Sequence, residues 1–285
     1  MRVALTRSVP PSIDRCELTH LQREPIDYTR AVREHAAYEE ALRRAGCRVE
    51  RLPDLPGHPD SVFVEDTAVV FERIAVIARP GAASRREEVA STVRALERHR
   101  PLAYIQAPAT LDGGDVLVTP GRVFVGVSGR TTAGGAHQLA TILAPHGIDV
   151  VPVVVTGCLH LKSAVTFCGD LRPEGPNLRP EGGNLRPEGG NLRPKGRSYL
   201  LINPAWVDSA PFAEFELVEV DPSEPHAANV LAVGDRVICA EAHVRTRRRL
   251  EAHGIVTWAV PASELAKAEG GVTCGSIIFT TGSQH

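Results

Sequence analysis

The sequence lacks the features that mark several classes of protein. Its formal net charge is only -2 over 285 residues, so no broad basic field favours nucleic acid or an acidic membrane surface. No stretch approaches the roughly 20 apolar residues of a membrane span, and the N-terminus has too short an apolar run for a signal peptide. The six cysteines are sparse and include no CxxC pair, which is typical of reduced thiols and not of a zinc site. We therefore expect a globular cytoplasmic protein without a nucleic-acid or membrane partner.

Strand-like runs and helical stripes follow one another in a repeated order. Hairpin, helix and strand occur in turn at about residues 66–106, again at 112–155 and again at 229–260. Residues 160–220 fit the same order if a long insertion divides the hairpin and the helix is short. The chain between the first and last of these units therefore consists of four similar pieces.

A fifth unit results only if the two ends of the chain meet. The strand after Cys274 would pair with the N-terminal strand, followed by a helix at 28–45 and a strand at 48–52. Five such units closed in this way predict a radial propeller. The alternative is a mixed α+β sheet in which the repeated order is a coincidence.

Residues 171–196 stand outside this order. They read LRPEGPN-LRPEGGN-LRPEGGN-LRPKG, a seven-residue repeat whose copies each carry proline, glycine and a single large apolar residue. No coiled-coil seam forms from such a repeat, so we expect a flexible turn-rich or polyproline-like loop. A fold tolerates such a loop because loop-closure entropy grows slowly with length; the other interpretation is a partner-binding segment. We take residues 1–285 as a single domain with 171–197 as an insertion.

Polar residues recur where the first strand of each unit begins. The first unit contributes Asp60, Glu65 and Asp66, the second Asp112 and Asp115, the third His160 and Lys162, the fourth Asn229, and the fifth Cys274 and Ser276. In a radial fold these positions face one another at the axis. Acids, a histidine and a cysteine then meet in one pocket, which supplies a nucleophile, a base to activate it and an acid to orient the base.

Each of these residues also has a plainer interpretation. Alone, Cys274 fits a small buried apolar residue, His160 a hydrogen-bonded core histidine and Asp112 a turn residue beside two glycines. Glu65 and Asp66 follow an apolar run, however, and burying two carboxylates without a cation is unfavourable. The combination of these residues favours a functional pocket with a cationic ligand.

A planar cation that takes paired hydrogen bonds from carboxylates is a guanidinium. Asp60 and Asp66 would hold its nitrogens and leave its central carbon open to the cysteine thiolate, whose pKa falls beside a cation. His160 would protonate the departing amine and then deprotonate water, which gives a ureido product. Arg85 and Arg130 would bind a carboxylate at the far end of the substrate; the alternative for both is a solvated surface charge.

Eight sequence motifs occur in a characteristic order: HPDSVFVEDTAVVF, SRREEV, LDGGDVLV, FVGVSGRT, HLKSAVT, NPAWVD, ANVLAVGDRVI and AKAEGGVTCGS. They span nearly the whole chain except 171–197 and resemble those of the dimethylarginine dimethylaminohydrolases, a family of the guanidino-group-modifying, amidinotransferase-like superfamily. The resemblance implies the pentein fold, an α/β five-bladed ββαβ propeller with pseudo-fivefold symmetry. It also implies hydrolysis of asymmetric dimethylarginine or monomethylarginine to citrulline and a methylamine, without a metal or an organic cofactor.

The resemblance assigns roles to individual residues. Cys274 would be the nucleophile, His160 the general acid and base, and Asp112 the carboxylate that orients the histidine. Asp60 and Asp66, with Glu65 beside them, resemble the ligands of the guanidinium. Arg85 and Arg130 resemble the pair that binds the substrate carboxylate. Backbone carbonyls of Leu18, on a mobile lid, and of Ala268 would meet the substrate amino group.

Two features depart from the family pattern. Gly275 follows the nucleophile, where relatives often carry a larger residue, and it adds backbone freedom at that point. The repeat at 171–196 interrupts the hairpin that begins with His160. We expect the repeat to loop outward, because the runs on both of its sides still read as strands.

Three other functions share part of this pattern. Deiminase-type hydrolysis of unmethylated arginine would use the same nucleophile and carboxylates, but the chain lacks the extra helical insertion that a resemblance to deiminases would demand. Transfer of an amidino group to an acceptor amine is a second alternative. A propeller that binds arginine-like ligands without catalysis is a third. No interface stripe distinguishes a monomer from a homodimer.

Overall fold

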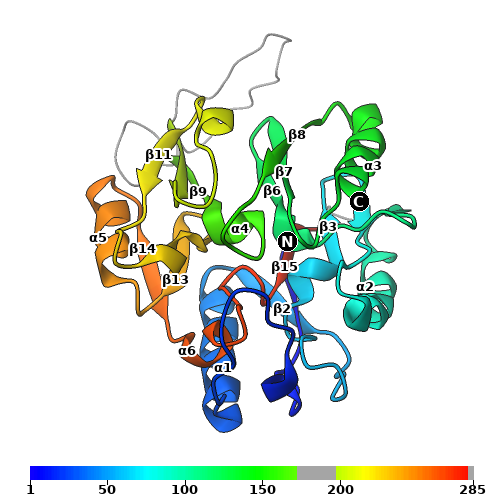
Figure 1. The fold of residues 1–285 in the computed structure, drawn as a ribbon, viewed down its shortest axis with the longest axis horizontal. Helices are drawn as coiled ribbons and strands as arrows, with labels where there is room; N and C mark the ends of the chain where they lie inside the picture. Colours follow the sequence, from blue (N-terminus) through cyan, green and yellow to red (C-terminus); the bar gives the residue numbers. More distant parts are fainter. Residues whose placement is uncertain (172–196, 282–285) are drawn as a thin grey trace.

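In the computed structural model, which describes residues 1–171 and 197–281, the strands form five three-stranded sheets around a common axis (Figure 1). Within each sheet the first two strands pair antiparallel, and the third runs parallel to the middle one. The longer helices lie around the outside of the sheets (Figure 1). The predicted five-bladed α/β propeller is confirmed.

Three of the sheets are continuous in sequence. The first contains β3 (Ala68–Val70), β4 (Ala75–Ile77), α2 (Val89–Leu96) and β5 (Leu102–Tyr104). The second contains β6 (Val116–Thr119), β7 (Arg122–Val127), α3 (Ala133–Leu143) and β8 (Asp149–Val154). The fourth contains β12 (Leu231–Val233), β13 (Arg236–Ala240), α5 (Val244–Ala252) and β14 (Thr257–Val260). All three follow the predicted order of hairpin, helix and strand.

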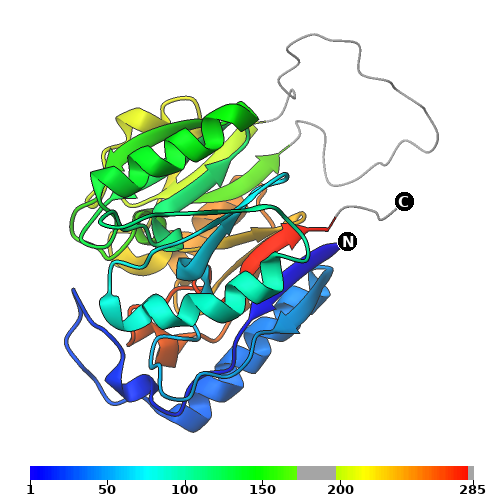
Figure 2. The ribbon, with the colours of Figure 1, turned by 90° about the vertical axis from the view of Figure 1, so that its right-hand side faces the viewer.

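The fifth sheet joins the two ends of the chain, as the sequence predicted. It contains β15 (Ile277–Thr280), β1 (Arg2–Thr6), α1 (Tyr28–Arg44) and β2 (Cys47–Arg51). Figure 2 shows β1 and β15 side by side, and their register pairs Val3 with Phe279. The backbone N–H of Thr281 also donates to Met1 O over 2.8 Å. The ring of sheets is therefore closed by hydrogen bonds between segments at opposite ends of the sequence.

The third sheet carries the insertion. It contains β9 (Val165–Leu171), β10 (Arg197–Ile202), a 3-10 helix (Ala210–Phe212) in place of the outer helix, and β11 (Glu216–Glu219). Pairing of β9 with β10 extends to Leu171 and Arg197. Since these two residues are partners, the hairpin stays closed up to the point where the insertion leaves it. The predicted flexible loop itself lies outside the described residues.

Apolar clusters join each sheet to the next. The five clusters lie between the first and second sheets, the second and third, the third and fourth, the fourth and fifth, and the fifth and first. Each is built from strand residues such as Val76, Phe124, Leu201, Ile238 and Val3. Buried apolar side chains therefore join neighbouring sheets at all five junctions of the ring.

None of the helices in the described ranges combines the length and the hydropathy needed to cross a bilayer.

Candidate active site

A short turn precedes the first strand of every sheet. These turns are the 3-10 helices Val64–Thr67, Gly113–Asp115 and Pro225–Ala228, the one-turn helix α4 (Leu161–Ala164), and the loop 270–276. They lie toward the middle of the ring, where α4 is labelled in Figure 1. The polar residues at the start of each unit therefore lie near the axis of the ring, as expected for a propeller.

A pocket lies beside the turn Val64–Thr67, the loop 270–276 and His160 at the start of α4. It is lined by seven of the predicted site residues: Asp60, Asp66, Arg85, Arg130, His160, Ala268 and Cys274. It is also lined by five residues that the sequence did not single out: Glu17, Phe63, Leu159, Glu269 and Gly270. Three of these, Glu17, Leu159 and Glu269, are each next to a predicted site residue in the sequence. That proximity is the signal by which they could have been found. Glu65, Asp112 and Leu18 are not part of the lining.

His160 lies between two carboxylates. Its Nε2 atom is 3.0 Å from Asp112 Oδ2, and its Nδ1 atom is 3.8 Å from Asp66 Oδ1. A Cβ atom at Gly114 would lie 2.6 Å from His160 Nδ1 and 2.8 Å from Asp66 Oδ1, so this approach requires glycine there. Burial opposes the charge, but Asp66, Asp112 and Asp115 raise the pKa of this imidazole to about 9. The ring is therefore protonated at neutral pH and able to act as an acid.

Two buried acids of the second sheet hold the histidine in place. Asp112 accepts a hydrogen bond of 2.8 Å from Gly81 N through the oxygen that does not face the imidazole. Asp115 accepts 2.8 Å from Leu161 N at the start of α4 and 2.6 Å from Ser128 Oγ. Because α4 begins directly after the histidine, Asp115 fixes the backbone that carries the ring. Asp112 orients the ring itself.

The carboxylates around His160 also have the spacing of a metal site. In the described ranges, ligand atoms of Asp66, Asp112 and His160 lie within 4.8 Å of one another, which is close enough for a metal ion. Asp66, however, also forms a buried ion pair of 2.5 Å with Arg85. One oxygen of Asp66 and the Oδ2 atom of Asp112 are thus already engaged by Arg85 and His160, which leaves an incomplete ligand set for a metal ion. We therefore assign these carboxylates to the histidine.

Cys274 is buried beside carboxylates. The backbone N–H of Gly271 donates to its Sγ atom over 3.3 Å. Burial, together with Glu65 and Asp66, raises the pKa of the thiol to about 12. The resting cysteine is therefore a thiol at neutral pH, and a cation that enters the pocket would favour the thiolate.

Glu65 holds the loop that carries the nucleophile. Its backbone N–H donates to Cys274 O over 3.1 Å, its Oε2 atom accepts from Thr273 Oγ1 over 2.7 Å and its Oε1 atom from Lys162 Nζ over 2.5 Å. Asn229 holds Thr273 from the other side through two hydrogen bonds of 3.0 Å. The resemblance places Glu65 beside the ligands of the guanidinium. Here both of its carboxylate oxygens are engaged within the protein, which favours a role in positioning the nucleophile.

Most of the donors of Arg85 are engaged by contacts within the protein. Its Nη1 atom is 2.5 Å from Asp66 Oδ2, its Nε and Nη2 atoms contact the carboxylate of Glu88, and Nη2 also donates to the backbone carbonyls of Asp60 and Phe63. Although burial opposes ionisation, the histidine and Arg85 lower the pKa of Asp66 to about 2. These contacts leave Arg85 few donors for a ligand, and its binding of the substrate carboxylate stays a prediction.

Residues 16–27 have no regular structure and border the pocket through Glu17; we call this segment the lid. The side chain of Leu18 packs against the apolar cluster that contains Ala268 and Cys274. Ala268 itself is buried and lines the pocket. The two residues expected to meet the substrate amino group therefore share one apolar cluster, with Ala268 in it and Leu18 packed against it.

Asp60 and Arg130 lie on the lid side of the pocket. Both carboxylate oxygens of Asp60 accept from the backbone N–H of Glu17, over 3.2 and 3.1 Å. The Nη2 atom of Arg130 donates to Thr19 Oγ1 over 3.1 Å, and the arginine is partly exposed. The sequence assigned Asp60 and Asp66 to the same guanidinium. In the structure Asp60 faces the lid, whereas Asp66 faces the histidine.

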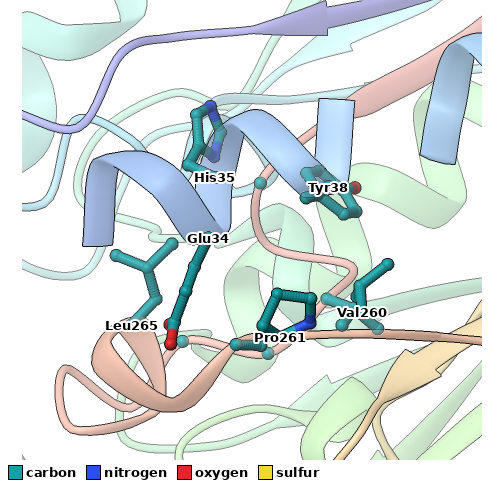
Figure 3. A pocket seen from close by; sticks show the side chains of 11 residues that line it. Glu34, His35, Tyr38, Val260, Pro261 and Leu265 are labelled. Carbon is teal, nitrogen blue, oxygen red and sulfur yellow. The ribbon is translucent and has the colours of Figure 1, made fainter. Parts of the chain in front are cut away.

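A second pocket borders the nucleophile loop where it meets α1 (Figure 3). In this view Glu34 extends from α1 toward the segment that carries Pro261 and Leu265, and Tyr38 projects from the same helix. The hydroxyl of Tyr38 is 2.7 Å from Ser276 Oγ, and both groups are buried. Helix α1 thereby contacts the loop two residues beyond the nucleophile.

Comparison with known proteins identifies close relatives, although no protein-family profile matches the chain. An N(G),N(G)-dimethylarginine dimethylaminohydrolase of Pseudomonas aeruginosa is 32% identical over 269 residues, which covers 94% of this chain and 94% of the relative. A protein of the same name from Streptomyces coelicolor is 36% identical over 275 residues, with 96% and 95% covered. Among solved structures, a variant of the Pseudomonas aeruginosa protein complexed with citrulline superposes with a TM-score of 0.82 at 31% identity, covering 97% of this chain and 98% of that one.

Proposed function

Because the chain belongs to the dimethylarginine dimethylaminohydrolase family, we propose that it hydrolyses Nω-methylated arginines. Asymmetric dimethylarginine would yield citrulline and dimethylamine, and monomethylarginine would yield citrulline and methylamine. The observation that carries the proposal is that Cys274, His160 and Asp66 line one pocket. A nucleophile, an acid and a carboxylate for a cation are the groups that this reaction needs.

Attack on the guanidinium comes first. The substrate cation enters beside Asp66, and its charge lowers the pKa of the Cys274 thiol, which releases its proton to solvent. The thiolate then forms a C–S bond to the central guanidinium carbon. As the C–N bond to the methylated nitrogen breaks, the protonated His160 donates its proton to the departing amine. The product of this half-reaction is a covalent thiouronium on Cys274.

Hydrolysis of the thiouronium completes the cycle. The imidazole of His160 is now neutral and accepts a proton from a water molecule as that water attacks the same carbon. The C–S bond breaks, citrulline leaves and the cysteine regains its initial state. Asp112 orients the ring in both halves through its hydrogen bond of 3.0 Å. No metal or organic cofactor takes part in these steps.

The amino-acid end of the substrate would lie under the lid. We assign its carboxylate to Arg130, because this arginine lines the pocket and is partly exposed. Its ammonium group would meet the carbonyls of Leu18 and Ala268, near Asp60. Arg85 would act indirectly by holding Asp66, and Glu65 by holding the loop of the nucleophile. These two roles differ from those that the resemblance implied.

The experiment that tests this function is a citrulline assay on the purified, reduced protein. Asymmetric dimethylarginine and arginine are supplied side by side, and dimethylamine is measured with citrulline. We expect dimethylamine release with little turnover of arginine. The reverse preference would establish deiminase-type hydrolysis, and absence of citrulline from both substrates would favour a propeller that binds arginine-like ligands without catalysis.

Other expectations from the sequence form part of the proposal. We propose a cytoplasmic enzyme that works as a monomer or homodimer and takes a small arginine derivative as its substrate. All six cysteines are free and buried, which supports a reducing compartment. Light scattering on the eluate of a sizing column would establish the oligomeric state.

A further inference from the structure

Glu269 has an unusual backbone conformation. It is the one non-glycine residue in the described ranges with a positive φ, at 58°. Its N–H donates to Ala266 O over 3.1 Å, and the N–H of Gly270 donates to Leu265 O over 3.0 Å. These two bonds form the Schellman turn that ends a helix, here α6 (Ser263–Ala266), and its left-handed residue is usually glycine because a Cβ atom is strained there. A glutamate at this position indicates that its side chain is needed.

One oxygen of Glu269 fastens the lid. Its Oε1 atom accepts the backbone N–H groups of three successive lid residues, Thr19 over 3.0 Å, His20 over 2.5 Å and Leu21 over 2.7 Å. Hydrogen bonds from backbone N–H groups to a carboxylate are charge-assisted and stronger than those between neutral groups. Since lid residues 19–21 carry no regular structure of their own, this contact sets their position over the pocket.

The other oxygen of Glu269 has no donor. Its Oε2 atom is buried and lacks a hydrogen-bond partner among the described residues. The residue lines the candidate active site together with its chain neighbour Ala268 and with Cys274. A buried carboxylate oxygen without a donor is unfavourable, so a donor supplied by the ligand would stabilise it.

The substrate carries two cationic groups, and only one is available to Glu269. The guanidinium must lie against Cys274 and His160 for the reaction to occur. The ammonium group lies at the opposite end of the substrate, which the proposed function places at the carbonyl of Ala268, one residue from Glu269. The unsatisfied Oε2 atom is therefore suited to the ammonium.

We propose that Glu269 is a substrate-binding residue that couples recognition of the ammonium group to closure of the lid. Its Oε2 atom accepts from the ammonium while its Oε1 atom holds residues 19–21. This inference rests on the proposed function. It predicts that guanidino acids without the ammonium group are poor substrates.

The experiment compares dimethylarginine with its des-amino analogue, 5-(dimethylguanidino)pentanoic acid, in the parent protein and in Glu269→Gln. Glutamine keeps the size and an acceptor for the lid but removes the charge. We expect the parent to prefer dimethylarginine by roughly a hundredfold in kcat/KM and the variant to lose about tenfold of that preference, since a hydrogen bond to a charged group contributes this much. Glu269→Ala should in addition raise the hydrogen-exchange rates of the amides of residues 19–21 by about tenfold or more, because their acceptor is gone.

Glu264→Gln is the matched control. Glu264 accepts from Asp27 N at the other end of the lid and does not line the pocket. It should lower activity on both substrates by the same factor. An equal loss on both substrates in Glu269→Gln would overturn the ammonium contact, and unchanged amide exchange in Glu269→Ala would overturn the lid contact. A parent protein that makes no citrulline would overturn the proposed function and the ammonium contact, whereas the exchange measurement would still decide the lid contact.

Discussion

Tyr38 lies so close to Gly275 that no side chain fits between them. A Cβ atom at Gly275 would be 2.9 Å from Tyr38 Cε1. The tyrosine ring is buried, and its hydroxyl is hydrogen-bonded to Ser276, so it has little freedom to move aside. The glycine after the nucleophile, which departs from the family pattern, therefore has a steric reason in this chain: α1 supplies a ring where a side chain at 275 would lie.

This contact predicts the effect of a single methyl group. Gly275→Ala should lower kcat by roughly tenfold or more with a smaller change in KM, because a displacement of the nucleophile of even a fraction of an ångström impairs attack. Steady-state kinetics on methylated arginine measures both constants. Tyr38→Leu combined with Gly275→Ala removes the ring that the methyl group meets, so the double variant should be better than the product of the two single effects. Strict additivity, or an unchanged kcat in Gly275→Ala, would rule out the steric explanation.

The protonation of the Cys274–His160 pair predicts the pH dependence of kcat/KM. Resting enzyme carries a thiol and an imidazolium, with pKa values of about 12 and about 9, whereas attack needs a thiolate and an imidazolium. The reactive pair therefore has one proton fewer than the resting pair at neutral pH. We expect kcat/KM to rise by about tenfold per pH unit below pH 9 and to level off near 9, where the resting pair has lost its first proton.

The variant Asp112→Asn tests whether the titration of His160 causes kcat/KM to level off near pH 9. Loss of the Asp112 charge lowers the pKa of His160, so kcat/KM should level off at a lower pH than in the parent. The substrate ammonium titrates identically with both enzymes, so the difference between the two profiles reports on the histidine. A profile that is flat between pH 6 and 9 would instead mean that the resting cysteine is already a thiolate.

The sequence predicted the ring and the convergence of the site residues because both follow from periodicity. The alternation of strand residues, the apolar stripes of the helices and the acids at the start of each unit are local patterns in the sequence. Closure of the ring by the two chain ends was inferred from the number of units alone. The contacts of Glu65 and Arg85 are harder to predict from the sequence. Glu65 bonds to Lys162 and Thr273 from two other units, and Arg85 bonds to Asp66, 19 residues away, and to Glu88 in the same 3-10 helix. Neither set of contacts follows from periodicity.

A local pattern misleads where a distant segment competes for a side chain. The spacing of Ser84 and Glu87 by itself would indicate a helix capping box. Yet the Ser84 hydroxyl donates to Glu17 in the lid over 2.7 Å, and the segment begins as a 3-10 helix, Ala83–Glu88, ahead of α2. The contact of Glu269 with the lid could not be predicted either, because no sequence pattern marks a non-glycine residue with a positive φ. Ser84 and Glu269 both hydrogen-bond to the lid, and the lid has no periodic pattern from which these contacts could be predicted.

The contacts of the two arginines predict different consequences of removing them. Arg85→Leu would leave Asp66 and Glu88 buried without their cation, so the free energy of unfolding should fall by about 3 kcal/mol or more. Arg130→Leu should change stability by less than about 0.5 kcal/mol, because the residue is partly exposed, and should raise KM by about tenfold or more. Urea denaturation and steady-state kinetics separate the two effects. An Arg85→Leu protein as stable as the parent, with only KM raised, would restore the role implied by the family resemblance.

Replacing the nucleophile tests the covalent mechanism. Cys274→Ser should abolish turnover while binding of dimethylarginine, measured by calorimetry, persists, since serine is a much weaker nucleophile without a strong base beside it. The parent protein, quenched in acid during turnover, should carry the mass of the thiouronium adduct, and the variant should not. Turnover in Cys274→Ser within about tenfold of the parent would contradict attack by the thiolate.

The hairpin of the third sheet predicts that the insertion is dispensable. Because Leu171 and Arg197 are partners in the ladder, residues 172–196 can be replaced by a two-residue Asn-Gly turn that joins them directly. Activity should stay within about twofold of the parent and the melting temperature should be equal or higher, since a shorter loop costs less entropy to close. A glycine-serine linker of the original length is the matched control and should behave like the parent. Loss of activity in both variants with an intact fold would mean that the repeat sequence itself contributes to the site, and loss of the fold would mean that the hairpin depends on it.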